Sequence, residues 1–311
     1  MWQERSGRTG VDKMKICMLG ASFDTGNLGV SALAEGSIKA ILGRWPDTEI
    51  SFIGCGQKPD VCQKEIGRQI VTITSWPLRF SPKLFVANHF LSVVFWGIVR
   101  RVVPRAWAMQ IDTRFKGIVG AISRCDLVVD LTGGDSFSDI YGLRRLILNF
   151  LCKRIMKVYG KPLVLMPQTY GPFDSRIGRF VARDILSWSA VVMSRDTDSI
   201  GEIEMLMAGR PMLAVPKLCP DVAFVLDAVR RETEQAKHLE QLKAEGKTLI
   251  GLNVSGLLYN GGYTGRNEFG LKCDYRRVVL EVARRFAAKD NHVIVLVPHV
   301  LPRNFPVEND L

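Results

Sequence analysis

The sequence predicts an α/β fold built from two Rossmann-like lobes, and three observations point to it. Apolar runs of strand length alternate with helix-length segments, which is typical of parallel βαβ units. Two of these runs, within 127–137 and 166–173, end in glycine, proline and small polar residues. Buried parallel strands end in this way where they deliver loops to the carboxyl edge of a sheet. The same alternation restarts at residue 248, so we expect a second sheet.

The chain length also favours two domains, because a single core rarely holds 311 residues. We assign 14–229 to an N-terminal Rossmann-like domain, 230–247 to a charged bridging helix and 248–311 to the start of a C-terminal Rossmann-like domain. The last 64 residues fall short of the roughly 100 that a domain needs, so we expect a truncated second lobe. Residues 1–13 are polar, lack a signal-peptide core and are interpreted as a disordered leader or tag.

Positive charge is concentrated in one part of the chain. The net charge is +11, and between Trp76 and Arg124 eight basic residues face one acid, Asp112. This excess indicates an anionic partner, such as a phosphate ester, an acidic lipid or a nucleic acid. The sequence has no zinc-finger spacing, RRM signature or basic–aromatic alternation, so we expect no nucleic-acid partner.

The composition is that of a globular protein in a reducing compartment. Apolar residues make up 47% of the chain and charged residues 23%. The seven cysteines are scattered, odd in number and never spaced as C-x-x-C. That pattern argues against a disulfide framework and against a zinc site. We therefore expect a cytoplasmic protein that needs no metal.

A glycine-bearing turn joins the first predicted strand, 16–20, to a helix at 30–42. Backbone N–H groups at such a helix start suit a phosphate or a carboxylate. The glycines at 20, 26 and 29 do not read G-x-G-x-x-G, and the next strand, 49–54, does not end in the acid that holds a ribose. We therefore do not expect NAD. Asn27 either reaches a ligand with its side chain or only forms the turn.

The most apolar run is 84–99, and Arg100 and Arg101 follow it. Its 16 residues fall short of the roughly 20 that span a bilayer. Three interpretations stay open: a buried helix, a helix on a membrane surface with its basic flank on lipid headgroups, and a true span. Peripheral membrane contact through 84–105 would suit a lipid-linked substrate. His89 is interpreted as a packed polar group.

Polar side chains follow the later predicted strands. The loop 168–173 follows the strand 162–167, and Arg195 follows the strand 190–194. An arginine at a strand end can clamp a phosphate or carboxylate with two hydrogen bonds, or it can pair with Asp196 or Asp198. Asp221 either faces the cleft or caps a helix at 222–228.

A histidine follows the last strand that we predict for the second lobe. Its predicted elements are a strand at 248–254, a helix at 275–288 and a strand at 292–297. His299 follows that last strand and is the best-placed imidazole for proton transfer. His238 and His292 are interpreted as structural.

Six motifs together resemble the polysaccharide pyruvyl transferase family. In chain order they lie at 26–29, 130–137, 167–172, 194–199, 220–224 and 297–299. The resemblance implies a two-lobed fold similar to GT-B glycosyltransferases, with phosphoenolpyruvate as donor substrate and no other cofactor. It implies a lipid- or nucleotide-linked sugar of a surface-polysaccharide precursor as acceptor, at the inner face of the membrane, and a pyruvate ketal as product. The chain departs from the family pattern at Val30, where an acid is usual.

The resemblance assigns roles to named residues. His299 is the candidate acid that protonates the donor, and Asp135 or Asp139 is the candidate that orients or deprotonates the acceptor hydroxyl, unless it caps the helix expected from Ile140. The candidate substrate-binding residues are Arg195, Asn27, Gly29, Gly133, Gly134, Gln168, Tyr170 and Asp221. Two alternatives remain: a GT-B-type glycosyltransferase that uses a nucleotide sugar, and a truncated, inactive binding protein.

Overall fold

The chain divides into two compact units. The computed structural model describes residues 13–23, 25–55, 58–67, 69–81, 86–114, 117–229, 232–302 and 308–310. Unit 1 comprises Met1–Ser22 and Ala32–Leu226, and unit 2 comprises Phe23–Ser31 and Asp227–Leu311. Residues 23–31, which the sequence analysis assigned to the N-terminal domain, thus group with the C-terminal part of the chain. The expected leader lies outside the described residues except for Lys13.

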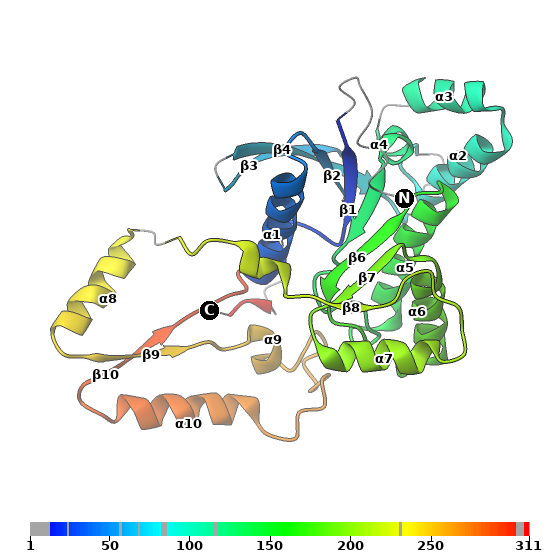
Figure 1. The fold of residues 1–311 in the computed structure, drawn as a ribbon. Coiled ribbons are helices and arrows are strands. Elements are labelled where there is room, and N and C mark those ends of the chain that lie inside the picture. The colour runs from blue at the N-terminus through cyan, green and yellow to red at the C-terminus, as the bar shows by residue number, and fades with distance from the viewer. Residues whose placement is uncertain are drawn as a thin grey trace. The chain divides into compact units, whose positions relative to one another are not determined.

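Unit 1 is organised around an eight-stranded sheet with the order β3-β4-β2-β1-β5-β6-β7-β8 (Figure 1). The strands are β1 (Lys15–Leu19), β2 (Glu49–Cys55), β3 (Asp60–Ile66), β4 (Gln69–Leu78), β5 (Leu127–Asp130), β6 (Leu163–Gln168), β7 (Val191–Ser194) and β8 (Lys217–Leu218). Every pairing is parallel except that of β3 with β4. The predicted α/β class with a parallel sheet is confirmed.

Helices pack on this sheet and supply its core. They are α1 (Leu28–Arg44), α2 (Phe90–Val102), α3 (Arg105–Arg114), α4 (Ile118–Arg124), α5 (Leu143–Val158), α6 (Arg176–Trp188), α7 (Thr197–Met207) and the 3-10 turn η2 (Val222–Val225). Apolar residues of α4 to α7 and of the central strands form one buried cluster. All four residues of β5 are buried, as is typical of a strand in the middle of a parallel sheet, and the first three are apolar.

One helix boundary differs from the prediction. The helix expected from residue 140 begins at Leu143, because its N-cap Gly142 has a positive φ of 90°. Asp196 caps α7 by accepting a hydrogen bond from the Ser199 N–H. Among the described residues, every helix is too short or too polar to cross a membrane.

Unit 2 contains a parallel pair of strands, β9 (Thr248–Leu252) and β10 (His292–Leu296). The helices α8 (Glu234–Ala244), α9 (Gly256–Tyr259) and α10 (Tyr275–Ala287) accompany them, and α10 runs alongside the strands in Figure 1. This is the predicted β-α-β order. The bridging helix is shorter than the expected 230–247, and residues 230 and 231 lie outside the described residues.

Candidate functional site

In unit 1, the loop after β5 meets the end of β1. Thr132, Gly133 and Gly134 have positive φ angles of 43°, 63° and 88°. The Gly133 N–H donates to the carbonyl of Gly20 at 3.1 Å, and a Cβ on Gly20 would overlap the backbone nitrogen of Thr132. Glycine is therefore required at position 20 by the close approach of two backbones. The two strand ends converge as predicted for the carboxyl edge of a parallel sheet.

A buried ion pair stabilises this loop. The Lys153 ammonium lies 2.9 Å from Oδ1 of Asp130, and these side chains are only 2% and 1% exposed. Lys153 also donates to the Thr132 hydroxyl at 2.9 Å, and that hydroxyl donates to Oδ2 of Asp130. The positive φ of Thr132 is thus held by hydrogen bonds on both sides of its hydroxyl.

Arg195 lies beside this loop, paired with a different acid from the two considered in the sequence analysis. Its Nη1 donates to Oδ2 of Asp221 at 2.8 Å, and its Nε donates to the Thr169 hydroxyl at 3.0 Å. A Cβ on Gly134 would lie 3.2 Å from Nη1. The Arg195 side chain is 29% exposed, so part of the guanidinium faces solvent.

Asp221 caps the turn that follows it, one of the two roles that the sequence left open, and it also pairs with Arg195. Its Oδ1 accepts from the Ala223 N–H at 2.8 Å and caps η2, while its Oδ2 holds Arg195. Because Asp221 neutralises Arg195, an anion bound there would also need neutral N–H donors.

The side chains of Gln168 and Tyr170 are buried, at 0% and 2% exposure. The Tyr170 hydroxyl donates to the carbonyl of Met193 at 3.0 Å, and burial raises the pKa of this phenol far above its ordinary value. The Tyr170 N–H donates to the Ser199 hydroxyl at 2.9 Å. These contacts hold the loop after β6 in place.

Asp135 and Asp139 have different surroundings. Asp135 is half-buried, and its Oδ2 accepts from the Tyr141 hydroxyl at 2.7 Å. Asp139 accepts from the backbone N–H groups of Asp174 and Ser175 at 3.1 and 2.8 Å, and from the Ser175 hydroxyl at 2.6 Å. Burial opposes ionisation of Asp139, but these donors outweigh it and hold its pKa below the ordinary value. Asp139 therefore ties the 139–142 turn to the start of α6, which is a structural role.

In unit 2, the glycine turn is paired with the segment that carries His299. Asn27 and Val300 form an antiparallel bridge. The Leu28 N–H donates to the His299 carbonyl at 3.0 Å, and the Leu301 N–H donates to the Gly26 carbonyl at 2.8 Å. Two predicted site segments, far apart in sequence, thus lie side by side.

The Asn27 side chain caps α1 with its oxygen and leaves its Nδ2 group outside this cap. Its Oδ1 accepts from the Val30 N–H at 3.1 Å. Its Nδ2 and the exposed Gly29 N–H have no partner among the residues that the structure describes. These donors at the N-terminus of a 17-residue helix are the groups that bind a phosphate or a carboxylate.

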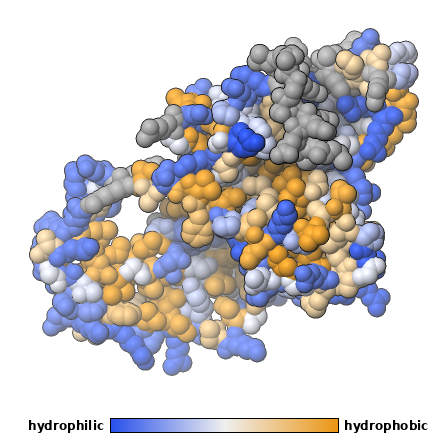
Figure 2. All heavy atoms as spheres, viewed as in Figure 1, coloured by the Kyte–Doolittle hydropathy of each residue, from blue (hydrophilic) through white to orange (hydrophobic). Residues whose placement is uncertain are grey.

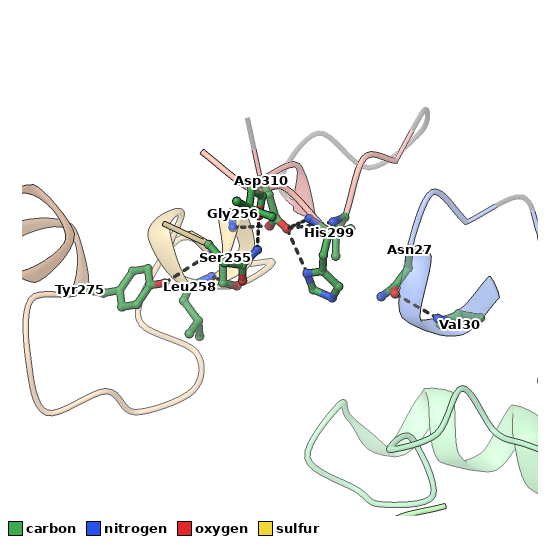
Figure 3. A network of polar contacts seen from close by, with 11 residues as sticks. Asn27, Val30, Ser255, Gly256, Leu258, Tyr275, His299 and Asp310 are labelled. Atoms are coloured by element: carbon green, nitrogen blue, oxygen red, sulfur yellow. Dashed lines mark hydrogen bonds and ion pairs between the residues drawn. The ribbon is translucent and has the colours of Figure 1, made fainter. Parts of the chain in front are cut away.

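His299 is held by an acid that the sequence analysis did not identify. The Asp310 side chain is 2% exposed, and its Oδ2 lies 3.2 Å from Nδ1 of His299, whose own side chain is 54% exposed (Figure 3). That oxygen also accepts from the N–H groups of His299 and Val300, and Oδ1 accepts from the Gly256 N–H. Figure 3 shows Asn27 across the imidazole from Asp310.

Asp310 holds its charge because several donors converge on it. Burial raises its pKa, but the N–H groups of Gly256, Val300 and His299, together with the His299 ring, outweigh burial and keep the pKa below the ordinary value. A carboxylate on Nδ1 directs the other ring nitrogen, Nε2, away from it. Among the described residues Nε2 has no hydrogen-bond partner, and more than half of the His299 side chain is exposed.

Sequence offered little signal for Asp310. It lies eleven residues after His299, beside Glu308 and Asn309, and nothing in its spacing distinguishes it from them. Among the described residues, no cluster of three or more histidine, cysteine or acidic side chains could hold a metal ion.

The chain has low sequence identity to solved structures. Two solved structures resemble the chain: the α,α-trehalose-phosphate synthase (UDP-forming) of Burkholderia vietnamiensis, at 12% identity and a TM-score of 0.39, and UGT71G1 of Medicago truncatula in complex with UDP-glucose, at 10% identity and a TM-score of 0.37. Each match covers 92% of this chain, but 64% of the synthase and 72% of UGT71G1. The chain therefore spans less than two thirds of the length of the synthase. None of the curated proteins matches.

A family model described as polysaccharide pyruvyl transferase matches residues 27–311, which include every candidate site residue. The match begins at the Asn27 turn and continues through the loop after β5, Arg195 and the His299–Asp310 pair. The resemblance noted in the sequence is thus confirmed over nearly the whole chain, and this protein belongs to the polysaccharide pyruvyl transferase family.

Proposed function

We propose that the protein transfers a pyruvyl group from phosphoenolpyruvate to a sugar of a surface-polysaccharide precursor and leaves it there as a ketal. Membership in a transferase family supports an enzyme that acts on a sugar or polysaccharide acceptor. We further propose that the donor is phosphoenolpyruvate, that the product is a ketal and that the acceptor is lipid- or nucleotide-linked.

The observation that carries this proposal is the imidazole of His299, oriented by buried Asp310 and exposed at Nε2. An enol phosphate becomes reactive when a proton is added to its methylene carbon, which turns into a methyl group. A protonated His299 gives that proton from Nε2, and Asp310 on Nδ1 stabilises the positive charge of the ring. Positioned acids of this kind contribute about 100- to 10,000-fold to a rate.

The positive charge that then develops at C2 of the donor is captured by two sugar hydroxyls. The first hydroxyl oxygen bonds to C2, and the second replaces the phosphate oxygen, so that the C2–O bond to phosphate breaks. Each hydroxyl loses a proton. One of these two protons replaces the proton that His299 gave to the methyl group, and the other leaves with phosphate. Asp135, held by Tyr141, is the half-buried carboxylate that we assign to hydroxyl deprotonation.

The donor also carries a carboxylate and a phosphate, which need hydrogen-bond donors. In unit 2 we assign one of these groups to the N-terminus of α1, with the Gly29 N–H and Nδ2 of Asn27 as donors. In unit 1 we assign Arg195 to an anion, with the adjoining Gly133–Gly134 loop, because its fork is already oriented by Asp221 and Thr169.

His299→Ala tests the proposed acid. We expect a loss of at least about 100-fold in phosphate release from phosphoenolpyruvate with a panel of sugar acceptors. Donor binding, followed by thermal shift, should persist. His292→Gln is the matched control, because His292 lies on β10 and its Nδ1 contacts Asn291. Undiminished turnover by His299→Ala would remove His299 from the mechanism.

Asp310→Asn tests whether Asp310 acts through His299. It keeps an oxygen acceptor and removes the charge, so kcat should fall while the KM for phosphoenolpyruvate changes little. In the His299→Ala background the same substitution should have no further effect. If it lowered the residual rate again, Asp310 would have a purely structural role.

The nucleotide-sugar alternative is tested by the same thermal-shift assay. Stabilisation by a nucleotide sugar, with none by phosphoenolpyruvate, would favour a glycosyltransferase. We also propose that the reaction takes place in the cytoplasm, because the seven cysteines are scattered, odd in number and never spaced as C-x-x-C, which is usual for proteins of a reducing compartment.

A further inference from the structure

The outer side of α2 carries a continuous apolar stripe that unit 1 does not cover. Its residues recur at intervals of four, three and four: Leu91, Phe95, Ile98 and Val102 are 53%, 57%, 50% and 76% exposed. This spacing places them on one side of a helix. Large side chains exposed in a row differ from the scattered single apolar residues that are normal on a surface.

The opposite side of the same helix is firmly packed. Val93 and Gly97 are buried, and the Tyr159 hydroxyl donates to the Val93 carbonyl at 2.8 Å. A Cβ on Gly97 would lie 2.5 Å from the Tyr159 ring, so the helix needs glycine there to approach α5. His89 caps the helix start: its Nδ1 accepts from the Leu91 N–H, and its Nε2 contacts the Ser81 carbonyl. The orientation of α2, and therefore of its stripe, is fixed.

The next helix, α3, also exposes large apolar side chains. Trp107 and Met109 are 64% and 68% exposed there. Figure 1 shows α2 and α3 at one end of unit 1, and in Figure 2 hydrophobic side chains gather along the outer edge of this region. An exposed tryptophan is typical of surfaces that sit at the level of lipid headgroups.

The part of the chain that forms α2 and α3 is strongly basic. Arg100 and Arg101 lie in the last turn of α2, where Arg101 also donates to the Lys157 carbonyl at 3.2 Å. The segment from Trp76 to Arg124 carries eight basic residues and one acid. A second copy of this chain is equally basic, so the charge would oppose its binding, and a protein partner would be attracted only if its surface were acidic. An anionic bilayer offers both acyl chains for the stripe and negative headgroups for the basic residues.

We propose that the α2–α3 surface binds the surface of an anionic lipid bilayer, with α2 lying in the plane of the interface and its stripe among the lipids. This interpretation selects one of the three that the sequence left open. The 13 residues of α2 extend about 20 Å at 1.5 Å per residue, too short for a hydrocarbon core of roughly 30 Å. The proposal concerns where the enzyme works and is independent of the donor it uses.

Vesicle co-sedimentation of the full chain tests the proposal. We expect binding to phosphatidylcholine vesicles that contain phosphatidylglycerol, and at least tenfold weaker binding to phosphatidylcholine alone. Added salt should weaken the binding, because it screens the net positive charge of the segment from Trp76 to Arg124. Absence of binding to the anionic vesicles, or equal binding to both kinds, would overturn the proposal.

Phe95→Asp tests the stripe itself, with Phe180→Asp as the matched control. Phe180 is 66% exposed on α6 of the same unit, away from the stripe. We expect Phe95→Asp to lower vesicle affinity about tenfold or more, and Phe180→Asp to leave it unchanged. Leu91→Ser gives the same test with a smaller change if Phe95→Asp does not fold.

Two further readouts keep the outcomes distinct. Phosphate release with a soluble acceptor should be unchanged in Phe95→Asp, so failure of the lipid proposal and failure of the proposed transfer reaction are separable. Size-exclusion chromatography follows the competing occupant. If the wild-type chain were a dimer that Phe95→Asp converts to a monomer, with equal vesicle binding by both, the stripe would be a self-association surface and the lipid proposal would be wrong.

Discussion

Lys153→Met removes the cation that supports the loop after β5. In the native structure the Lys153–Asp130 pair is 2.9 Å apart with both side chains at most 2% exposed, so the variant leaves a buried carboxylate with only the Thr132 hydroxyl and a marginal contact from Gln168 at 3.5 Å. Breaking a buried pair in this way costs about 3–5 kcal/mol. In a unit of the size of unit 1, that corresponds to a fall in Tm of roughly 6–20 °C.

Urea and thermal unfolding of matched variants measure this cost. Lys157→Met is the control: Lys157 lies one turn further along α5, is 39% exposed and pairs with Asp184 at 3.7 Å, so its loss should cost no more than about 1 kcal/mol. Adding Asp130→Asn to Lys153→Met should restore part of the stability, because the buried charge is gone. Equal destabilisation by the two lysine variants would refute the reasoning, since burial would then make no difference.

Two other perturbations test close packing and acid stability. Gly36→Ala should destabilise the protein by about 1–3 kcal/mol, because a Cβ there would overlap the Val222 carbonyl oxygen; Gly43→Ala, on the same helix with open space around it, should stabilise by up to about 1 kcal/mol. Equal effects in urea unfolding would contradict the close approach. The depressed pKa of Asp139 stabilises the folded state above its unfolded pKa of about 3.9, and this contribution is lost as pH falls through the folded pKa. Asp139→Asn should therefore flatten the acid side of the stability profile, and an unchanged profile would show that its contacts contribute nothing.

The centre of the sheet was predictable because its strands are buried on both faces. A strand in that position is mostly apolar, and the sequence shows this as the runs 127–129 in β5 and 16–19 in β1. The hairpin of β3 and β4 was missed for the opposite reason. It lies at the edge of the sheet, where exposed and buried residues alternate and the apolar signal is weak.

The partner of Arg195 illustrates a second limit. Sequence proximity suggested Asp196 or Asp198, but Asp196 caps α7 and Asp198 lies in the exposed first turn of that helix. The actual partner, Asp221, is brought to Arg195 by tertiary pairing: the Cys219 N–H donates to the Ser194 carbonyl at 2.8 Å, which places β8 and the residues after it beside β7. Ion pairs set by strand order are visible only after the sheet is known.

In the His299–Asp310 pair, one residue could be predicted from the sequence and the other could not. His299 could be predicted from its place at the end of a strand. Asp310 reaches the imidazole only because tertiary contacts hold its carboxylate, which accepts hydrogen bonds from the N–H groups of Gly256, His299 and Val300. Gly256 is essential to that arrangement, since a Cβ on it would overlap the Asn309 backbone. A single carboxylate therefore ties together the start of α9, the end of the strand segment and the imidazole. Because the same segment also pairs with the Asn27 turn, the ring and the free donors of that turn form one unit of structure, which is what a proton donor and an anion-binding group acting on one small substrate require.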